Sequence, residues 1–272
     1  MDIKDLESKA LEIRQLIVTT ILTTGSGHPG GSLSCVDILA SLYFRVLNID
    51  PSNPDNPIRD RFVLSKGHAA LGFYSTLAKR GFADESVMKT FRCDGSILAG
   101  HPYRNAIPGV EIGAGSLGHG LSVGVGMALS AKLDNADFKT YVLIGDGESQ
   151  EGSIWEAAMS GAHHKLDNLT VIVDRNRLQI DGNTEEILSL EPLEDKWESF
   201  GWTTKVIDGH SIEEIVDALE GPHRVKGKPF AIIANTVKGK GVSFMENDYE
   251  WHGMKEPIQG EIKKTILADV GL

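Results

Sequence analysis

The stretch YVLIGDGESQEGSIWEAAM, residues 141–159, decides the fold. Its first four residues are large and mostly apolar, which is typical of a strand buried in a sheet. The chain then turns on Gly145-Asp146-Gly147, and a helical pattern with an acidic start follows. Because an apolar strand that leads into a helix is half of a βαβ unit, the stretch predicts a parallel sheet covered by helices. It also places a carboxylate between two glycines, where the backbone can bend and a ligand can come close.

The rest of the chain repeats this alternation. Apolar runs predict strands at Arg61–Ser65, Tyr141–Gly145, Leu169–Asp174, Thr203–Asp208 and Phe230–Thr236. Helix-length patterns lie between them, at Cys35–Val46, Ala69–Lys79, Leu121–Leu133, Ser153–His164 and Ile212–Leu219. Strands that are apolar throughout are covered on both faces. We therefore expect an α/β fold, a mostly parallel sheet with helices on both faces, and a single domain over residues 1–272.

Composition and charge exclude several classes of function. The net charge of -11 and the pI of about 5.3 argue against nucleic acid and anionic membrane surfaces as partners. No run approaches the eighteen apolar residues that a membrane span needs. Cys35 and Cys93 are far apart and read as reduced thiols, which favours a cytoplasmic location. The amphipathic start of the chain, with Leu6, Ile13 and Ile17, suits a packing helix better than a signal or transit peptide.

A second polar residue follows the next predicted strand. The stretch VDRNRLQIDG, residues 173–182, places Asn176 just after Leu169–Asp174, as Asp146 follows Tyr141–Gly145. If these strands are neighbours, both side chains project into one space at the carboxyl edge of the sheet, where ligands bind in such folds. Carboxylate, amide and main-chain carbonyl oxygens suit Mg²⁺ or Ca²⁺, whose open positions phosphate oxygens can fill. A helix that begins next to this turn would add its positive end.

This pair completes the thiamine diphosphate signature, and the chain resembles transketolase, specifically its N-terminal, diphosphate-binding part. The resemblance covers nearly the whole chain. It rests on these motifs, in order: TGSGHPGGSLS (24–34), VLSKGHAALGFYSTLA (63–78), GHP (100–102), GSLGHGLSVGVGMA (115–128), GDGESQEGSIWEAA (145–158), DRNRLQIDG (174–182), TVKGKG (236–241) and WHG (251–253).

The resemblance implies a role for each matching residue. The metal ligands would be the side chains of Asp146 and Asn176 and the main-chain carbonyl of Leu178. Cofactor contacts would come from His68, Gly115, Leu117, Gly147, Asn176 and Lys238. Four histidines match those that line the channel to the thiazolium: His28, His68, His101 and His252. Glu151 matches an interface glutamate in a hydrogen-bond network between paired active sites.

The chemistry of these residue types is consistent with that assignment. The cofactor carries the electronic work, and the protein supplies position and polar groups. Imidazoles exchange protons near neutral pH, so we expect His28 and His252 near the reacting carbonyl, and His68 and His101 near the diphosphate or the donor sugar. Residues with a plainer explanation are His119 as a wall residue, Lys66 as a solvated lysine, Glu148 and Gln150 as polar residues at a helix start, and His163, His164, His210 and His223 as surface or packing residues.

The missing half of transketolase shapes the expected assembly. Only Met254–Leu272 follow the last motif, so we expect this chain to lack the pyrimidine-binding and C-terminal domains of the family. We expect them on a partner chain, a C-terminal transketolase subunit, in an α2β2 heterotetramer with the cofactor between subunits. The glycine-rich run at 113–128 predicts tight tertiary or subunit packing. The family transfers a two-carbon ketol unit between sugar phosphates of the pentose phosphate pathway, and a sulfonated sugar is another candidate substrate.

Other readings stay open at this point. The alpha subunit of 2-oxo acid dehydrogenases also carries an Asp…Asn metal site, but it lacks the SGHPG, KGHA and WHG set. The 1-deoxyxylulose-phosphate synthase family is related but is one long chain. A non-catalytic assembly partner would keep the fold without the reaction. A Rossmann dehydrogenase is disfavoured, because no GxGxxG opens a helix after the first strand.

Overall fold

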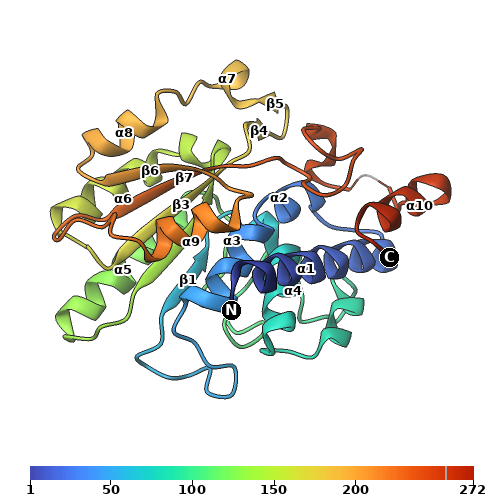
Figure 1. The fold of residues 1–272 in the computed structure, drawn as a ribbon, viewed down its shortest axis with the longest axis horizontal. Coiled ribbons are helices and arrows are strands. Elements are labelled where there is room, and N and C mark those ends of the chain that lie inside the picture. The colour runs from blue at the N-terminus through green and yellow to red at the C-terminus, as the bar shows by residue number, and fades with distance from the viewer. Residues whose placement is uncertain (255) are drawn as a thin grey trace.

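A five-stranded parallel sheet organises the computed structural model, which describes residues 1–254 and 256–272. Its strands lie in the order β1-β2-β3-β7-β6 (Figure 1). Their bounds are β1 Arg61–Leu64, β2 Thr140–Gly145, β3 Leu169–Arg175, β6 Thr203–Asp208 and β7 Phe230–Asn235. All four pairings are parallel. The predicted fold class is therefore confirmed.

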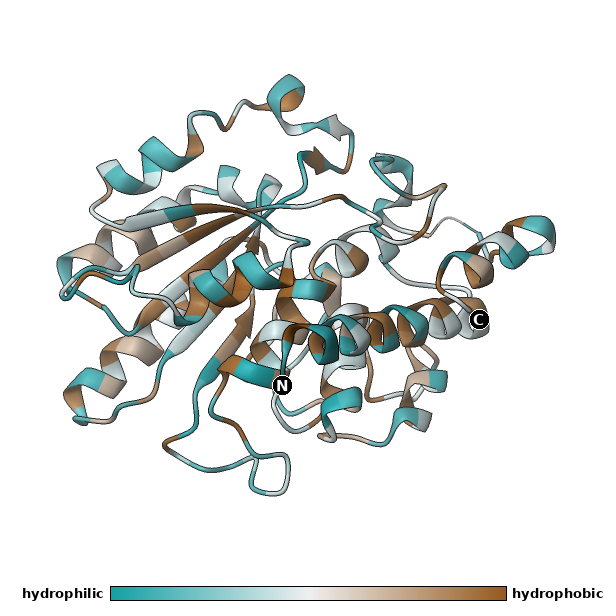
Figure 2. Ribbon diagram, viewed as in Figure 1, coloured by the Kyte–Doolittle hydropathy of each residue, from teal (hydrophilic) through white to brown (hydrophobic). Residues whose placement is uncertain are grey.

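Helices cover both faces of this sheet, as the apolar strands predicted. One face packs on α1 Ile3–Thr24, α3 Val36–Ser41, α4 Ala70–Arg80 and α9 Ile212–Glu220, and the other on α5 His119–Leu133, α6 Gly152–His163 and α8 Leu193–Ser199. Alternate residues of one strand join opposite cores: Tyr141 and Leu143 face the first set, Val142 and Ile144 the second. Figure 2 shows the strands as hydrophobic and the outer helix faces as largely hydrophilic.

Local sequence explains how the first helix begins and ends. Asp2 caps α1 by accepting from the Asp5 N–H, while the Asp5 side chain accepts from the Asp2 N–H, which completes a capping box. Gly25 ends the helix in the left-handed region at φ 66°, which glycine adopts without strain. The chain then enters the short helix α2 Pro29–Ser34, with Pro29 at its start.

Smaller elements complete the structure around the sheet. A π-helical turn, η1 Leu42–Val46, extends α3, and 3₁₀ turns occur at η2 Gly67–Ala69, η3 Glu85–Thr90, η4 Gly147–Gln150 and η5 Tyr249–His252. A two-stranded antiparallel hairpin, β4 Leu178–Gln179 with β5 Gly182–Asn183, leads into α7 Thr184–Ile187. The helix α10 Gly260–Asp269 contacts α1 near the C-terminus.

Two expectations from the sequence need correction. The helix after the GDG turn does not begin beside Asp146, because the 3₁₀ turn Gly147–Gln150 intervenes and α6 starts at Gly152. The strand β6 is less buried than the other strands, since it lies at an edge of the sheet and Thr203, Thr204 and Lys205 are only partly buried, although α8 and α9 contact it from opposite faces.

The strand register brings the functional motifs to one edge of the sheet. Gly145 of β2 pairs with Asp174 of β3, and Asp174 pairs with Ala234 of β7. The segments that follow these strands therefore leave the sheet side by side. The segment after β1 joins them from the neighbouring position, since β1 pairs with β2. Asp146 and Asn176 thus follow adjacent strands, which is the arrangement that their spacing predicted.

Two further features bear on the class of protein. Within residues 1–254 and 256–272, no helix is both long and apolar enough to cross a membrane. Neither cysteine forms a disulfide: Cys35 is buried in the core and Cys93 is exposed. Burial raises the pKa of the Cys35 thiol to about 12, so this group stays protonated at neutral pH.

Candidate cofactor site

A cavity of about 430 Å³ lies beyond the carboxyl ends of the strands. All twelve residues that the sequence predicted for the site line it: His28, His68, His101, Gly115, Leu117, Asp146, Gly147, Glu151, Asn176, Leu178, Lys238 and His252. They come from segments that follow β1, β2, β3 and β7, and from loops before α2, α5 and η5. Residues that the sequence spreads over more than 220 positions, from His28 to His252, therefore surround one space.

Asp146 is the buried carboxylate of this cavity, with only 2% of its surface exposed. Its Oδ2 accepts from the Arg175 guanidinium at 3.1 Å and from the Arg177 N–H, and its Oδ1 accepts from the Gly147 N–H at 2.8 Å. Burial, and then the nearby Asp174 carboxylate, raise the pKa of Asp146 above its ordinary value. A cation placed here would offset both effects.

The neighbouring oxygen donors lie in the segment after β3. The Asn176 Oδ1 accepts from the Leu178 N–H at 3.1 Å, and the Arg177 N–H that lies between them donates to Asp146. The Leu178 carbonyl points to the cavity, where the Lys238 ammonium donates to it at 3.1 Å. The three expected metal ligands are thus held to one another by short main-chain links.

The donor set fits a hard divalent cation and a diphosphate. A carboxylate, an amide oxygen and a carbonyl oxygen are ligands that Mg²⁺ and Ca²⁺ accept. The Leu178 carbonyl already has a cationic group, Lys238, as its partner. The Gln179 Oε1 is buried beside Gly147 with no hydrogen-bond partner, so the cavity wall offers one more free acceptor. Among the described residues no cluster of three His, Cys, Asp or Glu side chains could hold a metal ion.

Four histidines form a second wall of the cavity. The ring of His28 lies 5.9 Å from that of His68, 5.6 Å from that of His101 and 5.8 Å from that of His252, while His68 and His252 are 4.9 Å apart. These distances join ring centroids. Burial, then nearby cationic and imidazole groups, lower the pKa of His28 to about 4. Burial and Lys238 lower the pKa of His252 to about 3, and the pKa values of His68 and His101 are lowered too. All four rings are neutral at pH 7.

Both lysines near the cavity are buried, which corrects the plainer reading of Lys66. Lys66 is 1% exposed and forms an ion pair with Asp174, and it also donates to the Gly31 carbonyl at 2.9 Å. Lys238 is 2% exposed and lies 3.0 Å from the Nδ1 of His252. Burial, then the charge of Lys66, lower the pKa of Lys238 to about 8. An anion in the cavity would meet two buried ammonium groups.

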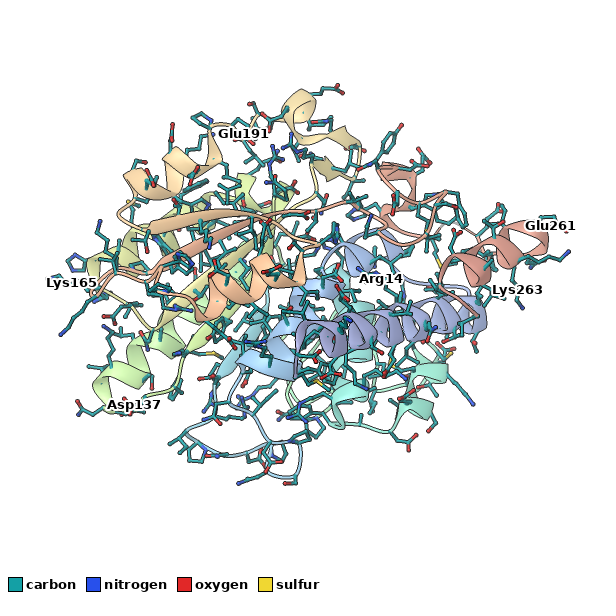
Figure 3. The ribbon with its side chains drawn as sticks, in the orientation of Figure 1. Arg14, Asp137, Lys165, Glu191, Glu261 and Lys263 are labelled. Carbon is teal, nitrogen blue, oxygen red and sulfur yellow. The ribbon has the colours of Figure 1, made fainter. Side chains whose placement is uncertain are left out.

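Arg175 is a site residue that the sequence reasoning missed. Its side chain is buried, and its guanidinium binds Asp146, the Thr184 hydroxyl at 2.7 Å, Glu185 at 2.8 Å and Glu191 at 2.9 Å. Glu191 lies in the segment between α7 and α8 (Figure 3). Because its partners lie up to 29 positions away, no local pattern marks Arg175 as anything but a polar residue at a strand end.

His210 is a second residue that the structure reassigns. Its Nε2 accepts from the Val237 N–H at 2.8 Å, so its proton sits on Nδ1, 2.8 Å from Asp37 Oδ2. Asp37 also forms an ion pair with Arg14, which lies on α1 (Figure 3). Since Val237 precedes Lys238, this chain of contacts holds the segment that carries a cavity lysine.

In the glycine-rich run at 113–128, some glycines pack against other parts of the chain and others are exposed. A Cβ on Gly124 would lie 2.4 Å from Val142 Cγ2, and one on Gly120 would lie 2.4 Å from the Ser65 side chain, so both positions need glycine for packing within the chain. A Cβ on Gly126 would meet nothing within 4 Å, and this residue is exposed. His119, expected in the wall, lies exposed at the start of α5 and does not line the cavity.

Comparison with known proteins agrees with this geometry. Residues 7–265 match the family described as "Transketolase, thiamine diphosphate binding domain". The chain belongs to the transketolase family. Its relatives include an apulose-4-phosphate transketolase subunit of Phocaeicola vulgatus, 48% identical over 93% of this chain and 89% of that one. Another is the 6-deoxy-6-sulfo-D-fructose transketolase subunit SqwG of a Clostridium species, 47% identical over 98% of this chain and 96% of that one.

Longer transketolases match over part of their length. The Homo sapiens transketolase is 38% identical over 97% of this chain but only 42% of its own. The crystal structure of transketolase from Campylobacter jejuni superposes with a TM-score of 0.90 at 36% identity, covering 100% of this chain and 43% of that one. The chain therefore spans about two fifths of these transketolases, and nearly all of the relatives that are named as subunits.

Proposed function

We propose that this chain is the N-terminal subunit of a split transketolase, which transfers a two-carbon ketol unit from a ketose to an aldose with thiamine diphosphate and a divalent cation. The observation that carries the proposal is the convergence of Asp146, Asn176 and Lys238 from three adjacent strand ends upon one cavity lined by four histidines. Membership of the transketolase family supplies the reaction class.

The residues present would hold the two groups as follows. Asp146, Asn176 and the Leu178 carbonyl would bind Mg²⁺ or Ca²⁺, and the cation would bind the diphosphate. Lys238 would move from the Leu178 carbonyl toward the diphosphate, while His68, Gly147, Gly115 and Leu117 would contact the cofactor. The bound thiamine diphosphate supplies the carbanion that ketol transfer needs.

The neutral histidines suit proton handling on sugar oxygens. A neutral imidazole accepts a proton at one nitrogen and donates at the other. The His28 Nδ1 is buried without a partner, so it is free to bind a substrate oxygen. We assign His28 and His252 to oxygens near the reacting carbonyl, and His68 and His101 to the diphosphate or the donor sugar. Glu151, on the cavity wall, is assigned to the contact between paired sites.

A partner chain is part of the proposal. The relatives named as subunits have about the same length as this chain, whereas the single-chain transketolases are more than twice as long. The pyrimidine-binding and C-terminal domains would therefore come from a second subunit, in an α2β2 assembly. The unpaired cysteines agree with a cytoplasmic location. Residues 1–272 would form the diphosphate-binding domain.

The substrate is the finer part of the proposal. Sugar phosphates of the pentose phosphate pathway are one candidate class. The two relatives named above are named for apulose 4-phosphate and for 6-deoxy-6-sulfo-D-fructose, and these names support a proposed substrate that carries a phosphate or a sulfonate. Both are tetrahedral anions at one end of a short ketose.

Reconstitution tests the proposal. The chain, mixed with a C-terminal subunit of a split transketolase, is assayed for ketol transfer with a panel of ketose phosphates and sulfonated ketoses. We expect transfer only when both subunits, thiamine diphosphate and a divalent cation are present. Transfer by this chain alone would contradict the split arrangement. Cofactor binding without transfer to any acceptor would favour the non-catalytic assembly partner.

A further inference from the structure

Glu148 lies two residues after Asp146, and its carboxylate is turned into the protein. The side chain is 2% exposed although the residue borders the cavity. Its Oε1 accepts from the Gly118 N–H at 2.9 Å and from the Ser65 hydroxyl, and its Oε2 accepts from the Gly145 N–H at 3.0 Å. The Ser65 Oγ in turn accepts from the Gly120 N–H at 3.1 Å. Both carboxylate oxygens are therefore engaged by donors of the chain itself.

These donors belong to three separate walls of the cavity. Ser65 follows β1 and precedes Lys66 and His68. Gly118 and Gly120 begin α5, directly after the cavity residues Gly115 and Leu117. Gly145 ends β2 and precedes Asp146. Glu148 thus ties together segments that lie 30 and 83 positions away from it in the sequence.

All three partners of the Glu148 carboxylate can donate to it: two are main-chain N–H groups, and the third is the Ser65 hydroxyl, whose oxygen also accepts from the Gly120 N–H. A glutamine in the same place would have nearly the same shape and would keep one acceptor oxygen. Its NH₂ group would face a main-chain N–H, so the hydrogen bond to that N–H would be lost.

We propose that Glu148 is a positioning residue that fixes the spacing between the Gly115–Leu117 loop and the Asp146–Gly147 turn. The cofactor would have to contact both segments at once, the turn through its diphosphate and metal, and the loop through main-chain atoms. Because both carboxylate oxygens of Glu148 already accept hydrogen bonds from the chain, we assign it no contact of its own with the cofactor. This inference rests on the proposed function, because the ligand that spans the two segments is thiamine diphosphate.

The test compares the wild-type chain with Glu148→Gln, with Ser65→Ala, and with Glu156→Gln as a matched control on the exposed face of α6. Thiamine diphosphate is titrated by calorimetry at saturating Mg²⁺ into each chain mixed with the C-terminal subunit, at a temperature at which circular dichroism shows every variant to be folded. We expect Kd to rise at least tenfold for Glu148→Gln, a few-fold for Ser65→Ala and less than twofold for Glu156→Gln. Wild-type affinity in Glu148→Gln would overturn the inference.

Amide hydrogen exchange of the ligand-free chain separates this inference from the proposed function. We expect the Gly118 and Gly145 amides to exchange slowly in the wild type and at least tenfold faster in Glu148→Gln, whereas amides of α9 stay unchanged. Equal exchange in both chains would overturn the positioning role even if cofactor binds. Absence of thiamine diphosphate binding by the wild-type chain mixed with the C-terminal subunit, together with this exchange pattern, would refute the proposed function and leave the contact in place. If Glu148→Gln does not fold, Ser65→Ala gives the same two readouts.

Discussion

At the scale of single residues, several groups that line the cavity have pKa values that burial has shifted from the ordinary ones. Asp146 has a raised pKa, and the histidines and Lys238 have lowered ones. Each shift disfavours the charged form in the ligand-free chain. A metal and a diphosphate would reverse these shifts, because each ligand brings the opposite charge to the group it meets. Binding of charged ligands to the cavity would therefore stabilise the charged forms of these groups.

The lowered histidine pKa values predict a loss of stability in acid. Histidine in the unfolded chain titrates near 6.5, whereas His28 titrates at about 4 in the folded chain. Between these values the unfolded chain binds more protons, so the free energy of unfolding falls as the pH is lowered from 6.5 toward 4. We expect the free energy of unfolding of His28→Gln, measured with urea, to fall less between pH 7 and 4.5 than that of the wild type. The exposed His119→Gln is the control, and an equal loss in His28→Gln would contradict the buried, neutral ring.

The contact between His210 and Val237 leads to a prediction about the position of Lys238. Replacing His210 by Ala leaves the Val237 N–H without its acceptor, which costs about 1–3 kcal/mol when such a group is buried. We expect the segment with Lys238 to shift and the Kd for inorganic diphosphate with Mg²⁺ to rise about tenfold, which is about 1.4 kcal/mol. Calorimetry of His210→Ala against His164→Ala, an exposed histidine on the far side of α6, measures this. Unchanged diphosphate affinity in His210→Ala would show that Lys238 does not depend on this contact.

Sequence alone located the residues that follow strand ends and missed those that act through distant partners. Asp146 and Asn176 were predictable because each stands just after an apolar run, and parallel strands bring their carboxyl ends together, whereas Lys238 was expected from its match to a transketolase motif. Glu148 and His210 were not, because their importance lies in hydrogen bonds to residues 30 and 27 positions away. A polar residue at a helix start or in a loop has the same local pattern whether it is solvated or buried.

At the scale of elements, the sheet followed from apolar runs and the irregular pieces did not. The strands β1, β2, β3 and β7 have buried residues on both faces, which is a strong sequence pattern. The edge strand β6 was also predicted, with the bounds Thr203–Asp208, whereas the two-residue strands of the β4–β5 hairpin and the short helix α8 are set by their neighbours rather than by their own periodicity. The 3₁₀ turn after Asp146 has the same origin, because its Glu148 side chain is drawn inward by three donors.

The helix α5 allows a matched pair of substitutions. Gly124→Ala would place a methyl group 2.4 Å from Val142, and such overpacking costs about 1–3 kcal/mol. Gly126→Ala meets nothing within 4 Å and should stabilise the isolated chain by about 1 kcal/mol, since Ala has the better helix propensity. Thermal unfolding of the two variants should move in opposite directions. A rise in the melting temperature of Gly124→Ala would contradict the close packing of α5 on β2.

At the scale of the whole molecule, one face of α5 and α6 has no partner within the described part of the chain. Val123, Gly126 and Met159 are exposed on these helices. The proposed assembly requires contacts between copies or with the second subunit, and a small residue such as Gly126 lets another helix approach closely. We expect Gly126→Leu to fold with a wild-type circular dichroism spectrum. The assembly that it forms should have a lower mass than that of the wild type in sedimentation velocity. Unchanged sedimentation would place the interface elsewhere.

The account as a whole depends on one ion bound between the ends of two neighbouring strands. The most direct test is calorimetric titration of thiamine diphosphate into this chain mixed with the C-terminal subunit. The titration is done with Mg²⁺, with EDTA, and with Mg²⁺ for Asp146→Asn, and Glu156→Gln on the exposed face of α6 is the control. The account predicts one saturable site that requires Mg²⁺, survives Glu156→Gln and disappears in Asp146→Asn. Binding of equal strength with EDTA, or in Asp146→Asn, would contradict it.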